Sequence, residues 1–263
     1  MVKGKPRASA RQRRLGQNFL ADTNLLDAIV RESGVGPGDT VLEVGGGGGA
    51  LTERLAAEAA HIHVIELDER LREVLGPIAE GAGNVEITWG DAMKTDLAAL
   101  DPPPSRMVAN LPYSVATPLL LRTIADLPSI RSWFVMVQRE IAERLRAEPG
   151  TREYGSPSVV AQLACDVSLV RTVDPAVFTP RPRVESALLR MGRTGPAAAP
   201  DVVALVREAF AHRRKSLARS LELARTGRIE EVRAALEAIG VSAGARAQEL
   251  SPGQFEQLAK ALS

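Results

Sequence analysis

The feature that most constrains the fold is a run of five glycines, Gly45–Gly49, between an apolar segment and a helical one. Residues 40–44 read as a buried strand, and a stretch with helical spacing begins at Ala50. Glycine lets the backbone turn sharply here and approach a ligand closely, with no Cβ in the way. Because Glu66 follows Gly45 by 21 residues, the pattern fits a nucleotide-cofactor site in which an acid binds a ribose. A glycine-rich turn that holds no ligand is the alternative.

The rest of the chain alternates short apolar runs with helical stretches, which predicts a doubly wound, Rossmann-like α/β fold. Each of the first four expected strands ends in Gly, an acid or Asn, where a parallel sheet places its ligand residues. The expected strands are residues 40–44, 62–66, 85–89, 107–109, 133–137, 167–173 and 187–191.

A change of composition near residue 192 indicates a second domain. The pattern beyond it is purely helical, and residues 210–221 read as one helix with an apolar stripe and a basic side. A later helix should begin near Pro252, with Ser251 as its N-cap. We therefore expect four parts in chain order: a basic flexible tail at 1–14, an α/β domain at 15–192, a linker at 193–200, and a small all-helical domain at 201–263.

The charge of the chain is strongly separated, although 33 Lys and Arg against 32 Asp and Glu leave a total of only +1. Residues 1–14 carry +6 and residues 207–228 carry +5, so the remaining residues sum to −10. This separation is typical of a nucleic-acid binder and predicts binding that weakens steeply with salt. For either cluster alone, a solvated tail or helix face explains the charge equally well.

The composition also excludes several other classes of protein. No apolar run approaches the roughly 20 residues that a membrane helix requires, and the first residues lack the apolar core of a secretory signal. The one cysteine, Cys165, cannot form an internal disulfide and fits a reducing, cytoplasmic setting. Three histidines and that cysteine show no recognisable ligand spacing, so we expect no metal. Nothing in the sequence demands more than a monomer.

The fourth expected strand ends in Asn110-Leu111-Pro112-Tyr113, a tetrapeptide suited to chemistry on an adenine amino group. That nitrogen is a poor nucleophile because its lone pair is delocalised into the ring. The Asn110 amide oxygen and the Leu111 carbonyl could accept its two hydrogens and aim the lone pair at a methyl group. Pro112 stiffens the turn, and Tyr113 offers a face on which an extruded base can stack. No general base is required, because the methylated nitrogen becomes acidic and loses its proton afterwards.

These motifs resemble those of the small-subunit ribosomal RNA adenine dimethyltransferases of the KsgA type, over nearly the whole chain. Besides the tetrapeptide, residues 15–20 resemble the entry motif of that family. Residues 178–186 are similar to its Phe-x-Pro-x-Pro-x-Val-x-Ser loop, and residues 210–221 to the start of its RNA-contacting helical domain.

The resemblance implies an S-adenosylmethionine-dependent methyltransferase that adds four methyls to two adjacent adenines near the 3′ end of 16S rRNA. The implied cofactor-binding residues are Asn18, Leu20, Gly45, Gly47, Glu66, Asp91 and Asn110. The implied catalytic residues are Asn110, Leu111, Pro112, Tyr113 and Phe178, with Phe178 packing against the flipped adenine opposite Tyr113. The basic residues expected to bind RNA are Arg11, Arg13, Arg14, Arg213, Arg214, Lys215 and Arg219.

The glycine run departs from the family loop, which carries Pro in the place of Gly46 and Leu in the place of Gly48. Each added glycine increases the conformational entropy of the unfolded chain and so lowers the free energy of unfolding by about 0.4–1 kcal/mol. We therefore expect weaker cofactor affinity or a less stable cofactor-free protein. Gly46→Pro together with Gly48→Leu should then tighten S-adenosylmethionine binding.

Three other functions stay open at this point. A related enzyme of the resistance class would methylate large-subunit rRNA instead, although Leu111 and Thr117-Pro118 favour the small subunit. A non-catalytic ribosome-assembly factor could have kept the fold, but the intact Glu66, Asp91 and tetrapeptide argue against it. A nicotinamide dehydrogenase would share the glycine loop and has no use for the tetrapeptide.

Overall fold

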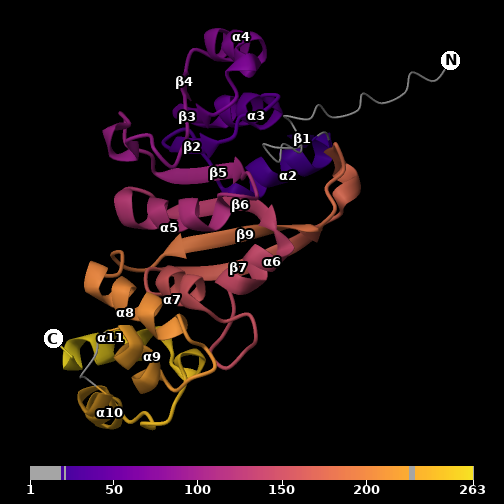
Figure 1. The fold of residues 1–263 in the computed structure, drawn as a ribbon. Coiled ribbons are helices and arrows are strands. Elements are labelled where there is room, and N and C mark those ends of the chain that lie inside the picture. The colour runs from indigo at the N-terminus through magenta and orange to yellow at the C-terminus, as the bar shows by residue number, and fades with distance from the viewer. Residues whose placement is uncertain (1–18, 21, 225–228, 263) are drawn as a thin grey trace. The chain divides into compact units, whose positions relative to one another are not determined.

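The computed structural model describes residues 19–20, 22–224 and 229–262, and the chain divides into two compact units (Figure 1). The first unit contains residues 19–142 and 168–192 of this part, and the second contains residues 143–167 and the described residues from 193 onward. The basic tail at 1–14, with Arg11, Arg13 and Arg14, lies outside the described residues, as does Asn18.

The first unit is built on a seven-stranded sheet with the order β4-β3-β2-β5-β6-β9-β7. Its first five strands run parallel, and β9 pairs antiparallel with β6. Every strand predicted from the sequence is present, with bounds moved by at most two residues. The strands are β2 (Thr40–Val44), β3 (His61–Glu66), β4 (Val85–Trp89), β5 (Arg106–Asn110), β6 (Ser132–Gln138), β7 (Cys165–Val173) and β9 (Ser186–Arg193). The Rossmann-like prediction is confirmed.

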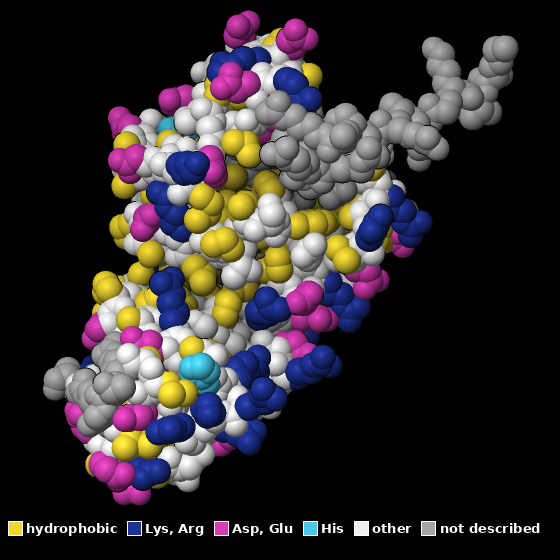
Figure 2. All heavy atoms as spheres, in the orientation of Figure 1, with side chains coloured by type: hydrophobic (Ala, Val, Ile, Leu, Met, Phe, Trp, Pro, Cys, Tyr) yellow, Lys and Arg dark blue, Asp and Glu magenta, His cyan; other side chains and the backbone are white. Residues whose placement is uncertain are grey.

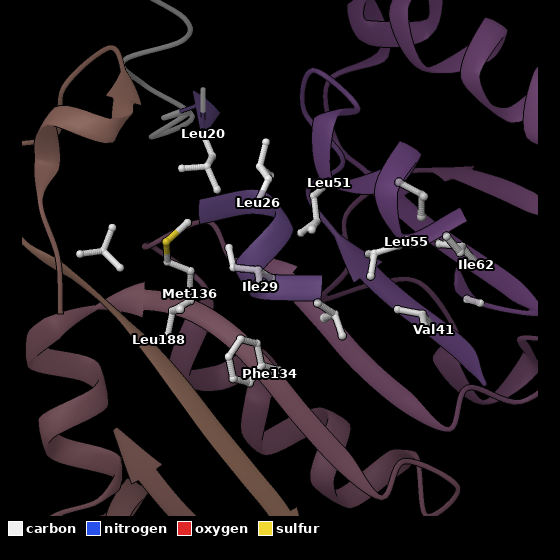
Figure 3. Packing of buried hydrophobic residues seen from close by; sticks show 14 of the residues in the cluster. Leu20, Leu26, Ile29, Val41, Leu51, Leu55, Ile62, Phe134, Met136 and Leu188 are labelled. Carbon is white, nitrogen blue, oxygen red and sulfur yellow. The ribbon is translucent and has the colours of Figure 1, made fainter. Parts of the chain in front are cut away.

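Helices cover both faces of the sheet because alternate strand residues are apolar on each side. On one face, α2 (Thr23–Ser33), α3 (Ala50–Glu58) and α4 (Arg72–Ala82) pack in a row against β6, β3 and β4. Figure 3 shows Leu26 and Leu55 of these helices with Phe134 of the sheet in one buried cluster. On the other face lies α5 (Ala116–Asp126), where the Trp133 indole N–H donates to the Thr123 hydroxyl at 2.9 Å.

A short antiparallel ribbon, which the sequence analysis did not predict, joins two distant parts of the first unit. It pairs β1 (Phe19–Leu20) with β8 (Phe178–Thr179), so that Leu20 lies opposite Phe178. Short 3₁₀ turns at Glu69–Leu71, Leu97–Ala99 and Pro175–Val177 complete this unit. Helix α6 (Arg139–Leu145) follows β6 and ends in the second unit.

The second unit is helical around an aromatic centre. The Tyr154 and Phe210 rings lie 6.0 Å apart and the Phe210 and Phe255 rings 5.9 Å apart, between centroids. Tyr154 is fully buried and its hydroxyl donates to the Leu250 carbonyl, so its role in this unit is structural. The helices are α7 (Ser156–Gln162), α8 (Pro200–Phe210), α9 (Leu217–Ala224), α10 (Ile229–Ala238) and α11 (Pro252–Ala261), with a 3₁₀ turn at Ala247–Glu249.

Two expectations for this region need correction. Residues 143–167 pack with the helical unit rather than with the α/β domain, partly because the Gly150 N–H donates to the Gln248 carbonyl. The single helix expected at 210–221 is two helices, α8 and α9. A turn separates them because the Ser216 hydroxyl accepts from the Arg219 N–H and so caps a new helix start. The prediction for the last helix is confirmed, since Ser251 caps α11.

No helix among the described residues is long and apolar enough to cross a membrane.

Candidate active site

A pocket of about 220 Å³ lies at the carboxyl ends of the parallel strands. Strand order reverses between β2 and β5, and such a switch point is where open α/β sheets bind ligands. Most of the residues that the sequence analysis assigned to the site in this unit line the pocket, although their positions span 20–113. They are Leu20, Gly45, Gly47, Glu66, Asp91, Asn110, Leu111, Pro112 and Tyr113.

The glycine loop connects β2 to α3 and requires glycine at three positions. Gly45, Gly47 and Gly49 have φ angles of 85°, 54° and 78°, in the left-handed region that other residues adopt at a cost. The Gly45 N–H donates to the Ile65 carbonyl at 2.9 Å, which ties the loop to β3. The loop therefore has one defined conformation that leaves open space on its pocket side.

The expectation for Gly46 needs correction. A Cβ at this position would lie 2.7 Å from Cγ1 of Val64, a fully buried side chain in β3. A β-branched neighbour inside the core has little freedom to move aside. Gly46→Pro would therefore strain the loop, and the gain in cofactor affinity expected from the sequence does not follow at this position.

Gly48 is the position at which a side chain should stabilise the protein. It is exposed, its φ is not positive, and a Cβ there meets nothing within 4 Å. We expect Gly48→Ala to raise the free energy of unfolding by about 0.4–1 kcal/mol, because it reduces the entropy of the unfolded chain. Gly49→Ala is the matched control, because its Cβ would lie 2.1 Å from Ile78 Cδ1 and it should destabilise. Urea unfolding of both variants tests this, and a stabilising Gly49→Ala would contradict it.

Two acids stand at the ends of neighbouring strands. Glu66 closes β3 and is 5% exposed, and its two carboxylate oxygens accept from the N–H groups of Gly47 and Asp68 at 3.0 and 2.8 Å. Asp91 follows β4, and its Oδ1 accepts from the Met93 N–H. Its Oδ2 accepts no hydrogen bond from the described residues, which leaves it available to a ligand. Both carboxylates are thus oriented by backbone donors before any ligand binds.

A third acid, Glu43, also lines the pocket and was missed from the sequence. It lies on β2, is 1% exposed, and its Oε2 accepts from the Thr52 hydroxyl at 2.7 Å. Burial raises the pKa of Glu43 to about 8, and the nearby charge of Glu66 acts in the same direction against the Thr52 hydrogen bond. The only sequence signal was an acid in an otherwise apolar strand.

The tetrapeptide follows β5 directly beside the glycine loop. A Cβ built on Gly45 would lie 3.5 Å from the Pro112 ring, so the two loops lie side by side. The Leu111 N–H donates to the Met136 carbonyl at 3.0 Å, which continues the pairing of β5 with β6 and fixes this turn. The Leu111 carbonyl accepts no hydrogen bond from the described part of the chain, so it remains an available acceptor beside Asn110.

Ser186 positions Tyr113, a role that the sequence analysis did not foresee. The two hydroxyl oxygens lie 2.6 Å apart, and Ser186 is fully buried at the start of β9. Burial raises the pKa of the Tyr113 phenol above its usual range, and the Ser186 hydrogen bond acts against that rise. Tyr113 therefore presents a neutral ring at the pocket. Ser186 ends the 178–186 motif, so the two motifs meet through this contact.

Phe178 is not among the residues that line the pocket. It is 3% exposed and belongs to the hydrophobic cluster with Leu20. It lies opposite Leu20, a pocket residue, across the ribbon, and its place opposite Tyr113 stays a prediction. Phe19, the neighbouring residue on β1, does line the pocket, and its ring would lie 3.2 Å from a Cβ at Gly47.

Four predicted RNA-binding residues lie on the second unit, all of them exposed: Arg213, Arg214, Lys215 and Arg219. The first three occupy the turn between α8 and α9, and the Arg213 guanidinium donates to the Arg152 carbonyl at 3.1 Å. Figure 2 shows Lys and Arg side chains gathered on one side of this part of the molecule. The break in the predicted helix thus presents the three cations together on a turn.

The pocket in the first unit fits S-adenosylmethionine. A carboxylate at the end of β3 suits the ribose hydroxyls, and Asp91 has a spare acceptor for an amino group. Leu67 lines the pocket with 53% of its surface exposed and offers an apolar wall for a flat ring. The glycine loop leaves space in the pocket for the methionine part of the cofactor. Side chains at Gly45 or Gly47 would narrow that space.

Comparisons with known proteins agree with this geometry. The family model described as ribosomal RNA adenine dimethylase matches residues 8–263. The ribosomal RNA small subunit methyltransferase A of Rubrobacter xylanophilus is 41% identical, over 96% of this chain and 95% of that protein. Two solved structures are similar. A dimethyladenosine transferase from Plasmodium falciparum has a TM-score of 0.78 and 25% identity, covering 91% of this chain and 95% of the other. The 23S rRNA methyltransferase ErmE has a TM-score of 0.68 and 27% identity, covering 93% and 99%. The chain therefore belongs to the ribosomal RNA adenine dimethylase family, whose members are S-adenosylmethionine-dependent methyltransferases.

Proposed function

We propose that this enzyme dimethylates two adjacent adenines near the 3′ end of 16S rRNA in the small ribosomal subunit. The observation that carries the proposal is the position of Asn110–Tyr113, at the end of β5 and lining the same pocket as the glycine loop. The name of the Rubrobacter xylanophilus relative supports the small subunit as the target. We expect the enzyme to act as a monomer in the cytoplasm, on immature small subunits.

Residues at the carboxyl ends of four parallel strands, together with Leu20 of β1, would hold the cofactor. S-adenosylmethionine supplies an electrophilic methyl group when bound. Glu66 would bind its ribose, Asp91 would accept from its adenine amino group, and Gly45 and Gly47 would let its methionine part lie against the backbone. Leu20 and Asn110 would close the pocket around it. Asn18 stays a predicted contact that lies outside the described residues.

Asn110 and Leu111 would activate the target nitrogen. The amide oxygen of Asn110 and the carbonyl of Leu111 accept the two amino hydrogens and hold the nitrogen pyramidal, with its lone pair toward the methyl group. Pro112 stiffens the turn that follows these two acceptors, so they are positioned beforehand. The proton leaves after methylation, so no basic side chain is needed beside them.

Tyr113 would provide the stacking face for the flipped adenine. Its ring is held by Ser186, so the base meets a preset surface. Phe178 would pack against the flipped adenine opposite Tyr113, on a ribbon whose other strand carries the pocket residue Leu20.

The exposed basic residues on the second unit, Arg213 to Lys215 and Arg219, would bind rRNA phosphates. Such contacts position the RNA without reading its sequence. Arg11, Arg13 and Arg14 stay predicted RNA contacts, outside the described residues.

The likeness to ErmE keeps large-subunit rRNA as a second candidate substrate. Transfer of labelled methyl groups from S-adenosylmethionine to immature small subunits and to large-subunit precursors separates the two. We expect label in the small subunit only. Label confined to the large subunit would establish the alternative, and binding without label in either would indicate a non-catalytic assembly factor.

A further inference from the structure

Three ligand-type side chains meet at the amino ends of β3 and β4, the opposite end of β3 from Glu66. His61 and His63 are the first and third residues of β3, and side chains two positions apart on a strand share a face. Glu86 on β4 is the register partner of His63. The sheet therefore places two imidazoles and one carboxylate side by side.

The three groups are close enough to bind one ion. Oε2 of Glu86 lies 3.8 Å from Nε2 of His61 and 3.7 Å from Nδ1 of His63. All three ligand atoms lie within 4.8 Å of one another. In a tetrahedral zinc site with bonds of about 2.0–2.1 Å, neighbouring ligand atoms are about 3.4 Å apart. Rotations of the three side chains would bring their ligand atoms from the observed separations to this spacing.

Both imidazole nitrogens that face the carboxylate lack hydrogen bonds. Nε2 of His61 and Nδ1 of His63 are buried and have no hydrogen-bond partner in the described part of the chain. The His63 side chain is 2% exposed, so water does not readily reach it. Buried polar atoms are normally satisfied, and an unsatisfied one calls for an explanation such as a missing ion.

The hydrogen bond of His63 Nε2 indicates that Nδ1 of the same ring can act as a metal ligand. Its Nε2 lies 2.9 Å from the Pro102 carbonyl oxygen, which can only accept, so Nε2 carries the proton. In the neutral imidazole, Nδ1 then presents a lone pair toward Glu86. A histidine that donates its other N–H to a backbone carbonyl has the arrangement usual for a metal ligand.

We propose that His61, His63 and Glu86 form a binding site for one divalent transition-metal ion, with Zn²⁺ as the best match. Two neutral imidazoles and a carboxylate suit zinc in preference to Mg²⁺ or Ca²⁺, which favour oxygen ligands. Glu86 is 59% exposed, so water can complete the coordination. The ion would tie β4, the edge strand that leads to Asp91, to its neighbour β3.

The spacing of these three ligands in the chain explains why no metal site could be predicted from the sequence. His61 and His63 are separated by one residue, and the third ligand lies 23 residues further on, in another strand. No local spacing marks such a site, because only the register between β3 and β4 brings Glu86 beside the two histidines.

Calorimetric titration with ZnCl₂ tests the proposal, using the full chain without an affinity tag after treatment with EDTA. We expect one Zn²⁺ per chain and a rise in Tm when it binds. His61→Asn and Glu86→Gln should each weaken Zn²⁺ binding by at least about tenfold and reduce the rise in Tm. His212→Asn is the matched control, because His212 is an exposed residue of the second unit and the only other histidine of the chain.

Circular dichroism without metal separates folding from binding. Glu86 is exposed, so Glu86→Gln should fold like the parent chain. Absence of stoichiometric binding to the parent chain would overturn the proposal. Equal Zn²⁺ affinity in the parent chain and the folded Glu86→Gln and His61→Asn variants would overturn it too.

Discussion

Asn110→Ala is expected to lower the rate of methyl transfer by about 10²–10³-fold, the loss usual when one preset polar contact at a reacting centre is removed. The substitution removes the amide acceptor at the end of β5 and leaves the Leu111 carbonyl as the sole acceptor of the pair. The adenine nitrogen would then keep more of its planar, delocalised form. Single-turnover transfer of labelled methyl groups to immature small subunits measures the effect.

The controls separate chemistry from binding and folding. S-adenosylmethionine affinity, measured by calorimetry, should also fall because Asn110 lines the cofactor pocket, but by less than the rate. Tyr113→Phe is a useful comparison, because it keeps the stacking ring and loses only the hydrogen bond to Ser186. Its rate should stay within about tenfold of the parent enzyme, whereas Tyr113→Ala should lose far more. An Asn110→Ala enzyme as fast as Tyr113→Phe would remove Asn110 from the mechanism.

Glu43→Gln is expected to stabilise the cofactor-free protein at pH 8 and to have little effect at pH 5. Because burial raises the pKa of Glu43 to about 8, the folded state holds a proton that the unfolded state has already released near pH 4.5. The folded state therefore binds more protons between these pH values, and the parent protein loses stability as the pH rises through this window. Because glutamine cannot ionise, the Glu43→Gln variant should not lose stability as the pH rises.

The difference between variant and parent should grow from pH 5 to pH 8 and then level off. At pH 8 it should be on the order of 4 kcal/mol, because each pKa unit is worth about 1.4 kcal/mol. Urea unfolding at several pH values measures it. Glu58→Gln is the matched control, since Glu58 is exposed on α3, and it should show no such trend. A stability difference that does not vary with pH would contradict a buried, protonated Glu43.

The parts predicted well from the sequence depend on local pattern. Each strand carries its own apolar run. In a parallel sheet the carboxyl ends of all strands lie on the same side of the sheet. For this reason Glu66, Asp91 and Asn110 could be assigned to one pocket although they are far apart in the chain. The start of the last helix could also be predicted from a short segment, because the capping residue Ser251 sets it.

The parts that failed depend on packing between distant residues. The clash at Gly46 comes from Val64 on the next strand, and the unpredicted β1–β8 ribbon comes from the pairing of Leu20 with Phe178. Neither contact has a signature within its own segment. The same holds for Ser186, which meets Tyr113 only because the sheet brings β9 beside the tetrapeptide.

The most direct test of the account is mass spectrometry of 3′-end fragments of small-subunit rRNA after incubation of immature subunits with the enzyme and S-adenosylmethionine. We expect two adjacent adenines that each carry two added methyl groups, and far less methylation by Asn110→Ala under the same conditions. Unmodified adenines at that position, with the parent enzyme folded and bound to S-adenosylmethionine, would contradict it.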